Sequence, residues 1–219
     1  MPFTIAIDGP AASGKGTIAR RIARELDFAY LDTGLLYRGV GVMVLDRGEN
    51  PEDPAAATRA AESFDPALME DPRLRGDEAA VAASKVAAIP GVRAAMLEFQ
   101  RAFGRTPPDG KEGAVLDGRD IGTAIFPDAD VKLFITAAVE VRAERRHKEL
   151  LGRGTPSIYA RVLQDMQERD QRDMSRSTAP MAIAPDAVVI DTSALDVEAA
   201  FEAAMDPIRK KQDRQNPVR

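Results

Sequence analysis

A glycine-rich segment near the start of the chain contains the residue types that hold phosphate groups. It consists of Gly9, Pro10, Ala11, Ala12, Ser13, Gly14, Lys15, Gly16 and Thr17. Glycines let the backbone curl so that its N–H groups point at phosphate oxygens, and a lysine there reaches the outer phosphates of a nucleotide. An apolar run, Phe3 to Ile7, precedes the segment, and an amphipathic stripe follows it. These features together predict a strand–loop–helix phosphate site, whereas glycine spacing alone would fit an empty turn.

Two further segments place acids and arginines directly after apolar runs. Asp32-Thr33-Gly34-Leu35-Leu36-Tyr37-Arg38 follows Ala29 to Leu31, and Asp117-Gly118-Arg119-Asp120 follows Ala114 to Leu116. Open α/β sheets bind ligands at the carboxyl ends of their strands, so we expect both segments at a ligand site. The stretch from Glu168 to Arg176 is similarly dense in charge. Each segment alone has a structural alternative, namely a packed tyrosine, a surface ion pair or a solvated helix face.

The residue counts exclude several kinds of catalytic centre. The 219-residue chain has no cysteine and one histidine, His147. Thiolate nucleophiles, disulfides, Cys-ligated metals and multi-histidine metal sites are therefore excluded. A Ser-His-Asp triad would have to use His147, which lies in a charged helical stretch and is interpreted as a solvated surface residue. The net charge of −5 predicts no general attraction to nucleic acid or membrane, so arginines must hold any anion locally.

Apolar runs and helical stripes alternate along the chain. Further strands are predicted at Val131 to Ile135 and Ala187 to Ile190. Helical faces that pack in the core are predicted from three stripes: Ile18, Ile22 and Leu26; Val92, Met96, Phe99 and Phe103; Val197, Phe201, Met205 and Ile208. The alternation predicts an α/β fold with three layers, α/β/α, around a five-stranded parallel sheet. We interpret residues 1–219 as one domain.

Two stretches interrupt this alternation. Between Asp46 and Asp77 prolines and glycines break the periodicity, which predicts a loop-rich excursion. Residues 152–156 separate a helix at Arg142 to Leu151 from one at about Ile158 to Arg172, and a lid and an ordinary surface turn are equally good interpretations. Residues 210–219 are interpreted as a polar tail. No apolar run of about 18 residues and no signal-like start is present, so we expect a cytoplasmic protein.

The phosphate loop departs from the general motif, because Gly16 stands between Lys15 and the hydroxyl residue Thr17. The resulting Gly-Lys-Gly-Thr resembles the variant found in nucleoside monophosphate kinases. An Asn-Lys-x-Asp motif, typical of GTPases, is absent. Together with the segment 32–38, the stretch Ala82 to Arg93, the segment 117–120 and the charged stretch 168–176, in this order, the loop makes the chain resemble the cytidylate kinase family from about Phe3 to Pro207.

This resemblance implies a P-loop NTPase fold, ATP as co-substrate with Mg²⁺, and CMP or dCMP as acceptor. It implies that Ser84, Arg93 and Asp120 face the cytosine. An aspartate can accept a hydrogen bond from the cytosine amino group while arginine or serine donates to its acceptors. By the same resemblance, the residues near the sugar or the base are Thr33, Tyr37, Arg169 and Asp173. The residues that hold the acceptor phosphate are Arg38, Arg119 and Arg176.

Catalysis is expected to depend on positioning and charge neutralisation, because a phosphate oxyanion needs no strong base to activate it. We expect catalytic contributions from Lys15, Arg119 and Arg176, and from the lid arginines Arg145, Arg146 and Arg153. For each lid arginine a surface charge of little effect is an equal alternative. Thr17 and Asp117 are the expected Mg²⁺ contacts, and a structural cap is the alternative for Asp117.

Two segments differ from the family pattern. In the acceptor-side excursion, about residues 48–91, the span from Gly48 to Asp77 is shorter than in longer bacterial members. The lid, about residues 145–157, is compact between Leu150 and Ser157. Thr33 stands where serine is more usual. Two other hypotheses stay open: a kinase of the same fold for UMP, AMP or shikimate, and a nucleotide-binding module without turnover. We expect a monomer that binds small molecules, and neither nucleic acid nor membrane.

Overall fold

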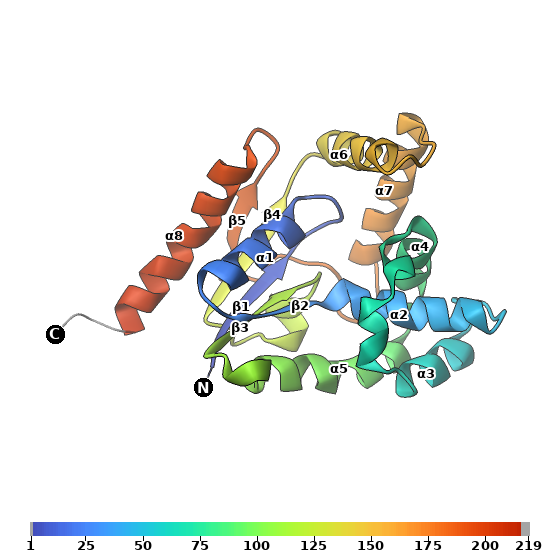
Figure 1. The fold of residues 1–219 in the computed structure, drawn as a ribbon, viewed down its shortest axis with the longest axis horizontal. Coiled ribbons are helices and arrows are strands. Elements are labelled where there is room, and N and C mark those ends of the chain that lie inside the picture. The colour runs from blue at the N-terminus through green and yellow to red at the C-terminus, as the bar shows by residue number, and fades with distance from the viewer. Residues whose placement is uncertain (1, 216–219) are drawn as a thin grey trace.

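A five-stranded parallel sheet forms the centre of the computed structural model, which describes residues 2–215 (Figure 1). The strands are β1 (Phe3–Asp8), β2 (Ala29–Asp32), β3 (Gly113–Asp117), β4 (Val131–Thr136) and β5 (Val188–Asp191). Their order across the sheet is β2-β3-β1-β4-β5, and each neighbouring pair is parallel. All five predicted strands are therefore confirmed, and β1, which leads into the glycine-rich loop, lies in the middle.

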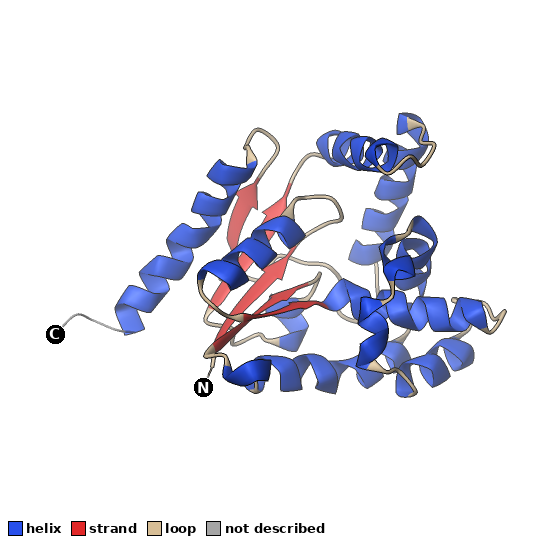
Figure 2. Cartoon of the chain, in the orientation of Figure 1, coloured by secondary structure: helices blue, strands red, loops and turns tan. Residues whose placement is uncertain are grey.

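Helices cover both faces of the sheet, as predicted (Figure 2). Ile5 and Ile7 of β1 pack against α1 (Lys15–Glu25) and α8 (Val197–Gln215). Ala6, between them, faces the opposite way and belongs to a second cluster with side chains of α5 (Pro90–Arg105). This alternation along one strand is what a sheet buried on both faces requires.

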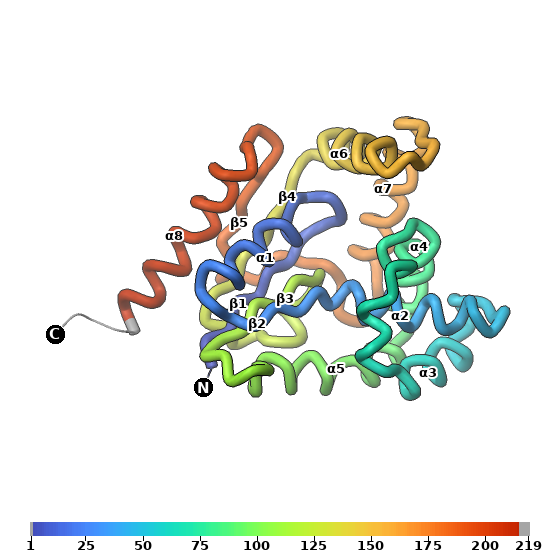
Figure 3. The backbone as a smooth tube through the Cα atoms, in the orientation of Figure 1, coloured from blue at the N-terminus to red at the C-terminus, as the bar shows by residue number. Residues whose placement is uncertain are grey.

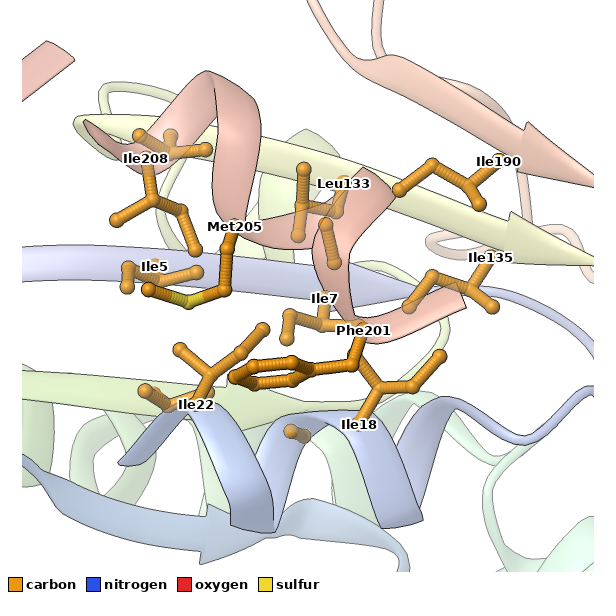
Figure 4. Packing of buried hydrophobic residues seen from close by; sticks show 14 of the residues in the cluster. Ile5, Ile7, Ile18, Ile22, Leu133, Ile135, Ile190, Phe201, Met205 and Ile208 are labelled. Carbon is orange, nitrogen blue, oxygen red and sulfur yellow. The ribbon is translucent and has the colours of Figure 1, made fainter. Parts of the chain in front are cut away.

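The core between the sheet and helices α1 and α8 is built from aliphatic side chains, one phenylalanine and one methionine (Figure 4). The stripes predicted around Ile22 and Phe201 are both part of it. Val197 is the exception, because it is 60% exposed and the packed part of α8 begins at Ala200. The predicted tail starts inside α8: residues 210–215 continue the helix, and residues 216–219 lie outside the described residues.

The stretch between Asp46 and Asp77 is helical rather than loop-rich. It follows α2 (Thr33–Asp46), contains α3 (Pro54–Glu62) and the 3₁₀ turns η1 (Pro66–Glu70) and η2 (Pro72–Arg75), and leads into α4 (Asp77–Val86). The prediction was wrong because it treated proline only as a helix breaker, although proline suits the first helical position. An aspartate precedes each of these prolines and caps the turn through its carboxylate: Asp53, Asp65 and Asp71.

Helices α6 (Val139–Gly152) and α7 (Tyr159–Met174) pack together as a hairpin that projects from the carboxyl edge of the sheet (Figure 1). The two predicted helices are thus confirmed. His147 is half-buried rather than fully solvated, and its Nδ1 lies 2.8 Å from the Ser157 Oγ of the hairpin turn. Among residues 2–215 no single helix is long and apolar enough to cross a membrane, and the bent pair Asp77–Val86 and Pro90–Gly110 reaches that length only with both arms together.

Candidate functional site

The glycine-rich loop joins β1 to the first turn of α1 at the carboxyl edge of the sheet (Figure 3). Gly9 has a φ of 146°, and a Cβ there would lie 2.0 Å from the carbonyl oxygen of Ile135, so the close approach of β4 requires glycine. Gly14 has a φ of 88° at the start of α1. The N–H groups of the first helical turn face the loop and attract anions.

Lys15 extends from α1 toward the end of β3. Its Nζ lies 3.2 Å from Oδ1 of Asp117, and both side chains are largely buried. Burial and the charge of Arg119 lower the pKa of Lys15, and the charge of Asp117 opposes this. A Cβ at Gly16 would lie 3.0 Å from Oδ2 of Asp117. The inserted glycine therefore allows this carboxylate to approach the first turn of α1.

Asp117 has a second acid beside it, because the register of β2 and β3 pairs Asp32 with Asp117. Asp32 caps α2 by accepting a hydrogen bond of 3.0 Å from the N–H of Gly34. Burial and the charge of Asp117 raise the pKa of Asp32. The hydroxyl of Thr33 donates to the carbonyl oxygen of Asp117 at 2.8 Å. In the described part of the chain the Asp117 carboxylate caps no helix, and its Oδ1 is paired with Lys15.

Arg93 of α5 and Asp120, just beyond β3, form a buried ion pair. The Arg93 guanidinium also lies 5.7 Å from the centre of the Tyr37 ring. Burial raises the pKa of Asp120, and the charges of Arg93 and Arg176 oppose this shift. Ser84 of α4, the helix before α5, is also buried. Its Oγ accepts a hydrogen bond of 2.7 Å from Arg172 of α7. The structure thus brings together Arg93, Asp120 and Tyr37, three of the residues that were assigned to the base or sugar.

Asp173 is the acid that joins two of the predicted phosphate-binding arginines. Its Oδ2 accepts from Nε of Arg119 at 3.2 Å, and its Oδ1 pairs with Arg176. Burial favours the neutral form of Asp173, but the charges of Arg119, Arg176 and Arg169 hold its pKa below the usual range. Burial and the charge of Arg119 lower the pKa of Arg169 to about 9. The three partly buried guanidinium groups of Arg119, Arg169 and Arg176 around one carboxylate leave excess positive charge, which suits a phosphate.

Arg38 lies near this cluster but is tied to the acceptor-side excursion. Its guanidinium donates to the carbonyl oxygen of Leu74 at 2.6 Å. Burial lowers the pKa of Arg38, and the charge of Asp32 opposes that change. The predicted segments at 32–38, 84–93, 117–120 and 169–176 therefore meet at one end of the sheet, although they come from five separate helices and turns.

The three predicted lid arginines point in different directions. Arg145 donates to Oγ1 and the carbonyl oxygen of Thr192, at 3.0 and 2.6 Å. Arg146 pairs with Asp77 at the start of α4, and Arg153 donates to the carbonyl oxygen of Arg75 at 3.1 Å. A cavity of about 510 Å³ adjoins the glycine-rich loop, and its lining includes Ser13, Thr17, Arg145, Arg146, Thr192 and Leu195. Arg145 and Arg146 thus line the cavity beside the loop, and Arg146 and Arg153 both contact the excursion.

Two buried charged residues at the site were missed in the sequence. Asp8 accepts hydrogen bonds of 2.8 Å from the N–H groups of both Ile121 and Gly122, at the start of the wide turn η4 (Ile121–Ile125). Arg142 of α6 is buried against the glycine-rich loop. The acid that ends β1 was a usable signal for Asp8. Arg142 lies among other arginines in a charged helix, and no pattern in the sequence distinguishes it.

Sequence comparisons with known proteins agree on one family. A family model described as cytidylate kinase matches residues 5–210. The cytidylate kinase of Paramagnetospirillum magneticum is 60% identical over 211 residues, which cover 96% of this chain and 100% of that protein. The cytidylate kinase of Rhodospirillum rubrum is 58% identical over 207 residues, covering 94% and 97%. Among solved structures, an uncharacterized protein from Eubacterium ventriosum has a TM-score of 0.50 at 15% identity, covering 94% and 98%, and is similar in fold alone.

Proposed function

The chain belongs to the cytidylate kinase family, and from this membership we infer that it transfers the γ-phosphoryl group of ATP to CMP, giving CDP and ADP. We extend the proposal to dCMP as a second acceptor. The observation that carries the assignment to a pyrimidine acceptor is the buried Arg93–Asp120 pair beside the Tyr37 ring. A buried charge pair next to an aromatic face offers both a donor and an acceptor to a flat, polar base.

The segment Asp117 to Asp120 supports the proposal because it borders both halves of the reaction. At its start, Asp117 contacts Lys15 of the phosphate loop. Near its end, Arg119 contacts Asp173, the acid that also pairs with Arg176. In-line phosphoryl transfer requires donor and acceptor phosphates to be held close together and in a fixed orientation. A turn shared by the two sites fixes the distance between them.

The charged side chains and the loop N–H groups act by binding the phosphates and neutralising their charge. Lys15 and the loop N–H groups bind the β- and γ-phosphates, and Arg119 and Arg176 bind the acceptor phosphate. Arg38 joins them once it leaves the Leu74 carbonyl oxygen, and Arg169 adds further positive charge. Asp173 keeps the forks of Arg119 and Arg176 oriented. The acceptor phosphate oxygen attacks as an anion, so no general base is needed.

We propose Thr17 and Asp117 as the protein groups that hold Mg²⁺, together with phosphate oxygens and water. The carboxylates of Asp117 and Asp32 are register partners at the ends of neighbouring strands, beside the phosphate loop, and they fit this ion, which is usually bound by one or two carboxylates and by substrate phosphates. No group of three or more His, Cys, Asp or Glu in residues 2–215 forms a metal site by itself. When bound, Mg²⁺ neutralises charge on the β- and γ-phosphate oxygens.

Base selectivity is proposed to depend on Asp120, Arg93 and Ser84. The Asp120 carboxylate accepts from the cytosine amino group, and arginine or serine donates to the ring acceptors. Uracil presents an oxygen where cytosine has its amino group, so Asp120 would face another acceptor. A site built to bind a polar group rejects an analogue that leaves its buried partner unpaired.

The adenosine of ATP is proposed to occupy the 510 Å³ cavity beside the loop, where Arg145 is held by Thr192. Arg146 lies at the same cavity and is proposed to act on the phosphates after it leaves Asp77. For Arg153 the contact with Arg75 favours a structural role at the lid turn. We keep the boundaries 48–91 for the acceptor-side excursion and 145–157 for the lid as proposals.

One assay tests the proposal against its alternatives. ADP release from ATP and Mg²⁺ is measured with CMP, dCMP, UMP, AMP and shikimate as acceptors, and without any acceptor. We expect the highest kcat/KM with CMP and little ATP hydrolysis alone, because water at the γ-phosphate would waste ATP. A higher value with UMP or AMP would contradict the base assignment. Hydrolysis that is as fast without CMP as with it would contradict kinase activity altogether.

We also propose a monomer that acts in the cytoplasm on small nucleotides, and that binds neither nucleic acid nor membranes. The net charge of −5 supports the lack of nucleic-acid binding. Size-exclusion chromatography with light scattering tests the oligomeric state, and a mass of twice 23.6 kDa would contradict it.

A further inference from the structure

The apex of the phosphate loop is part of the hydrophobic core of the α6–α7 hairpin. Ala11 and Ala12 pack against the cluster formed by Ala143 and Leu150 of α6 with Val162 and Met166 of α7. Ala12 has a φ of 57°, a left-handed conformation that residues with a Cβ adopt rarely. Packing against the hairpin therefore helps to hold the loop in a conformation that Ala12 disfavours on its own.

Arg142 adds a polar connection at the same place. Its side chain is 5% exposed, and its guanidinium donates to three partners: the carbonyl oxygens of Ala11 and Ala137, at 3.3 and 2.8 Å, and Oδ2 of Asp170, at 2.6 Å. One planar group thus joins the phosphate loop, the start of α6 and the last turns of α7. The second carboxylate oxygen of Asp170 is buried and has no hydrogen-bond partner. Without Arg142 the Asp170 charge would lack its guanidinium partner.

The last turns of α7 contain the residues proposed to bind the acceptor. Arg169 precedes Asp170, and Asp173 lies one helical turn further on, where it orients Arg119 and Arg176. Arg172 of the same turn donates to Ser84 in the base pocket. Any shift of α7 along or around its axis therefore moves several acceptor contacts together.

We propose that Arg142 is a positioning residue that couples the ATP-binding loop to the CMP-binding end of α7, so that ATP and CMP strengthen each other's binding. When phosphates bind the loop N–H groups, the Ala11–Ala12 peptides settle in one conformation. The Arg142 guanidinium, which donates to Ala11 in this conformation, also holds Asp170 and thereby the acceptor-binding residues of α7. The coupling is reciprocal, because each ligand stabilises the same arrangement of loop and hairpin. This inference rests on the proposed function.

The test measures the coupling itself. The Kd of CMP is determined by isothermal titration with and without a saturating non-hydrolysable ATP analogue and Mg²⁺, and the ratio of the two values is the coupling factor. We expect a factor of about five or more in the unchanged protein, within the usual range for coupled sites. Arg142→Gln and the isosteric Asp170→Asn are each expected to bring the factor to within about twofold of one.

A double variant and a surface control complete the design. If Arg142 and Asp170 act as one unit, the Arg142→Gln/Asp170→Asn protein has the same coupling factor as either single variant. Lys148→Gln on α6, which breaks an exposed pair with Glu144, is expected to keep the coupling of the unchanged protein. A structural role alone would lower the thermal midpoint in both Arg142→Gln and Asp170→Asn without changing the coupling factor. Asp170→Asn carries the test if Arg142→Gln fails to fold.

The outcomes separate this inference from the function on which it rests. A protein that phosphorylates CMP but has a coupling factor near one, or whose factor survives both substitutions, overturns the coupling alone. A protein that does not phosphorylate CMP overturns the proposed function and the inference with it.

Discussion

The ammonium group of Lys15 lies 3.2 Å from Oδ1 of Asp117, which joins the phosphate loop to the end of β3 in one largely buried ion pair. Gly16, the next residue after the lysine, makes room for this carboxylate, since a Cβ there would lie 3.0 Å from Oδ2 of Asp117. The sequence feature that first separated this loop from the general motif therefore has a steric explanation. Glycine at this position lets the Asp117 carboxylate approach the loop, and no flexibility of the loop needs to be invoked.

Gly16→Ala should therefore impair catalysis while the helix remains stable. Alanine is the better helix former, but its Cβ would push the Asp117 carboxylate away from Lys15. We expect kcat/KM for ATP to fall about tenfold or more, measured at saturating CMP. Gly152→Ala, at the end of α6, is the matched control, because its Cβ would meet no atom within 4 Å. Equal kinetics for the two variants would contradict the steric role.

Asp117→Asn should weaken the use of Mg²⁺. The amide keeps the shape of the carboxylate but loses the charge that the cation requires. We expect the Mg²⁺ concentration for half-maximal activity to rise and kcat to fall about a hundredfold, with activity abolished by EDTA in the unchanged protein. Asp206→Asn, which affects only an exposed pair with Lys210, serves as control. An unaltered Mg²⁺ requirement in Asp117→Asn would remove this acid from the proposed metal site.

Asp120→Asn should reduce the preference for CMP over UMP. The asparagine amide can donate to the uracil oxygen that the carboxylate repels, so the two acceptors become more alike. We expect the ratio of kcat/KM for CMP to that for UMP to fall at least about tenfold. The KM for ATP reports whether the phosphate loop remains intact. A variant that keeps the full preference would show that Asp120 does not read the base.

The order of strands and helices could be predicted because alternating apolar runs and stripes reflect burial directly. The loop from Gly9 to Thr17 was equally visible, since its function depends on residue types that are adjacent in sequence. Helix α3 was missed because its start depends on the Asp53–Pro54 pair, and the rule that proline ends helices was applied without its exception for the first turn.

Contacts between distant segments were harder to predict. Arg142, Arg145, Arg146 and Arg153 lie in one charged helix and its turn, yet they contact the loop, Thr192, Asp77 and Arg75 respectively. Only the packing of α6 in space decides which of them adjoins the phosphate site. The family resemblance assigned Asp173 to the site only as an expectation, whereas its double pairing with Arg119 and Arg176 required the structure.

Ile22→Ala should destabilise the whole protein. Ile22 is fully buried in the core between the sheet and helices α1 and α8, where its removal leaves a cavity (Figure 4). We expect the free energy of unfolding to fall by about 2–5 kcal/mol in urea titrations. Val197→Ala, at an exposed position of α8, should change it by less than about 0.5 kcal/mol. Similar losses in both variants would contradict the assignment of the core.

Asp8→Asn should weaken the dependence of stability on pH. Burial raises the pKa of Asp8 from 3.8 to about 7, against the hydrogen bonds from Gly122 and Ile121 that favour the charged form. The folded protein therefore holds this proton more tightly than the unfolded chain. The resulting stabilisation is complete below about pH 3.8 and is lost as the pH rises through about 7.

Urea unfolding of the unchanged protein and of Asp8→Asn at pH 5 and pH 8 measures this contribution. Asparagine cannot titrate, so the part of the fall in unfolding free energy between the two pH values that comes from Asp8 disappears in the variant. The raised pKa values of Asp32 and Asp120 act in the same direction in both proteins and cancel in the comparison. Asp65→Asn, an exposed cap of η1, should leave the pH difference unchanged. An equal pH difference in the unchanged protein and in Asp8→Asn would mean that Asp8 is already ionised throughout this range, with its charge held by the two N–H groups of η4.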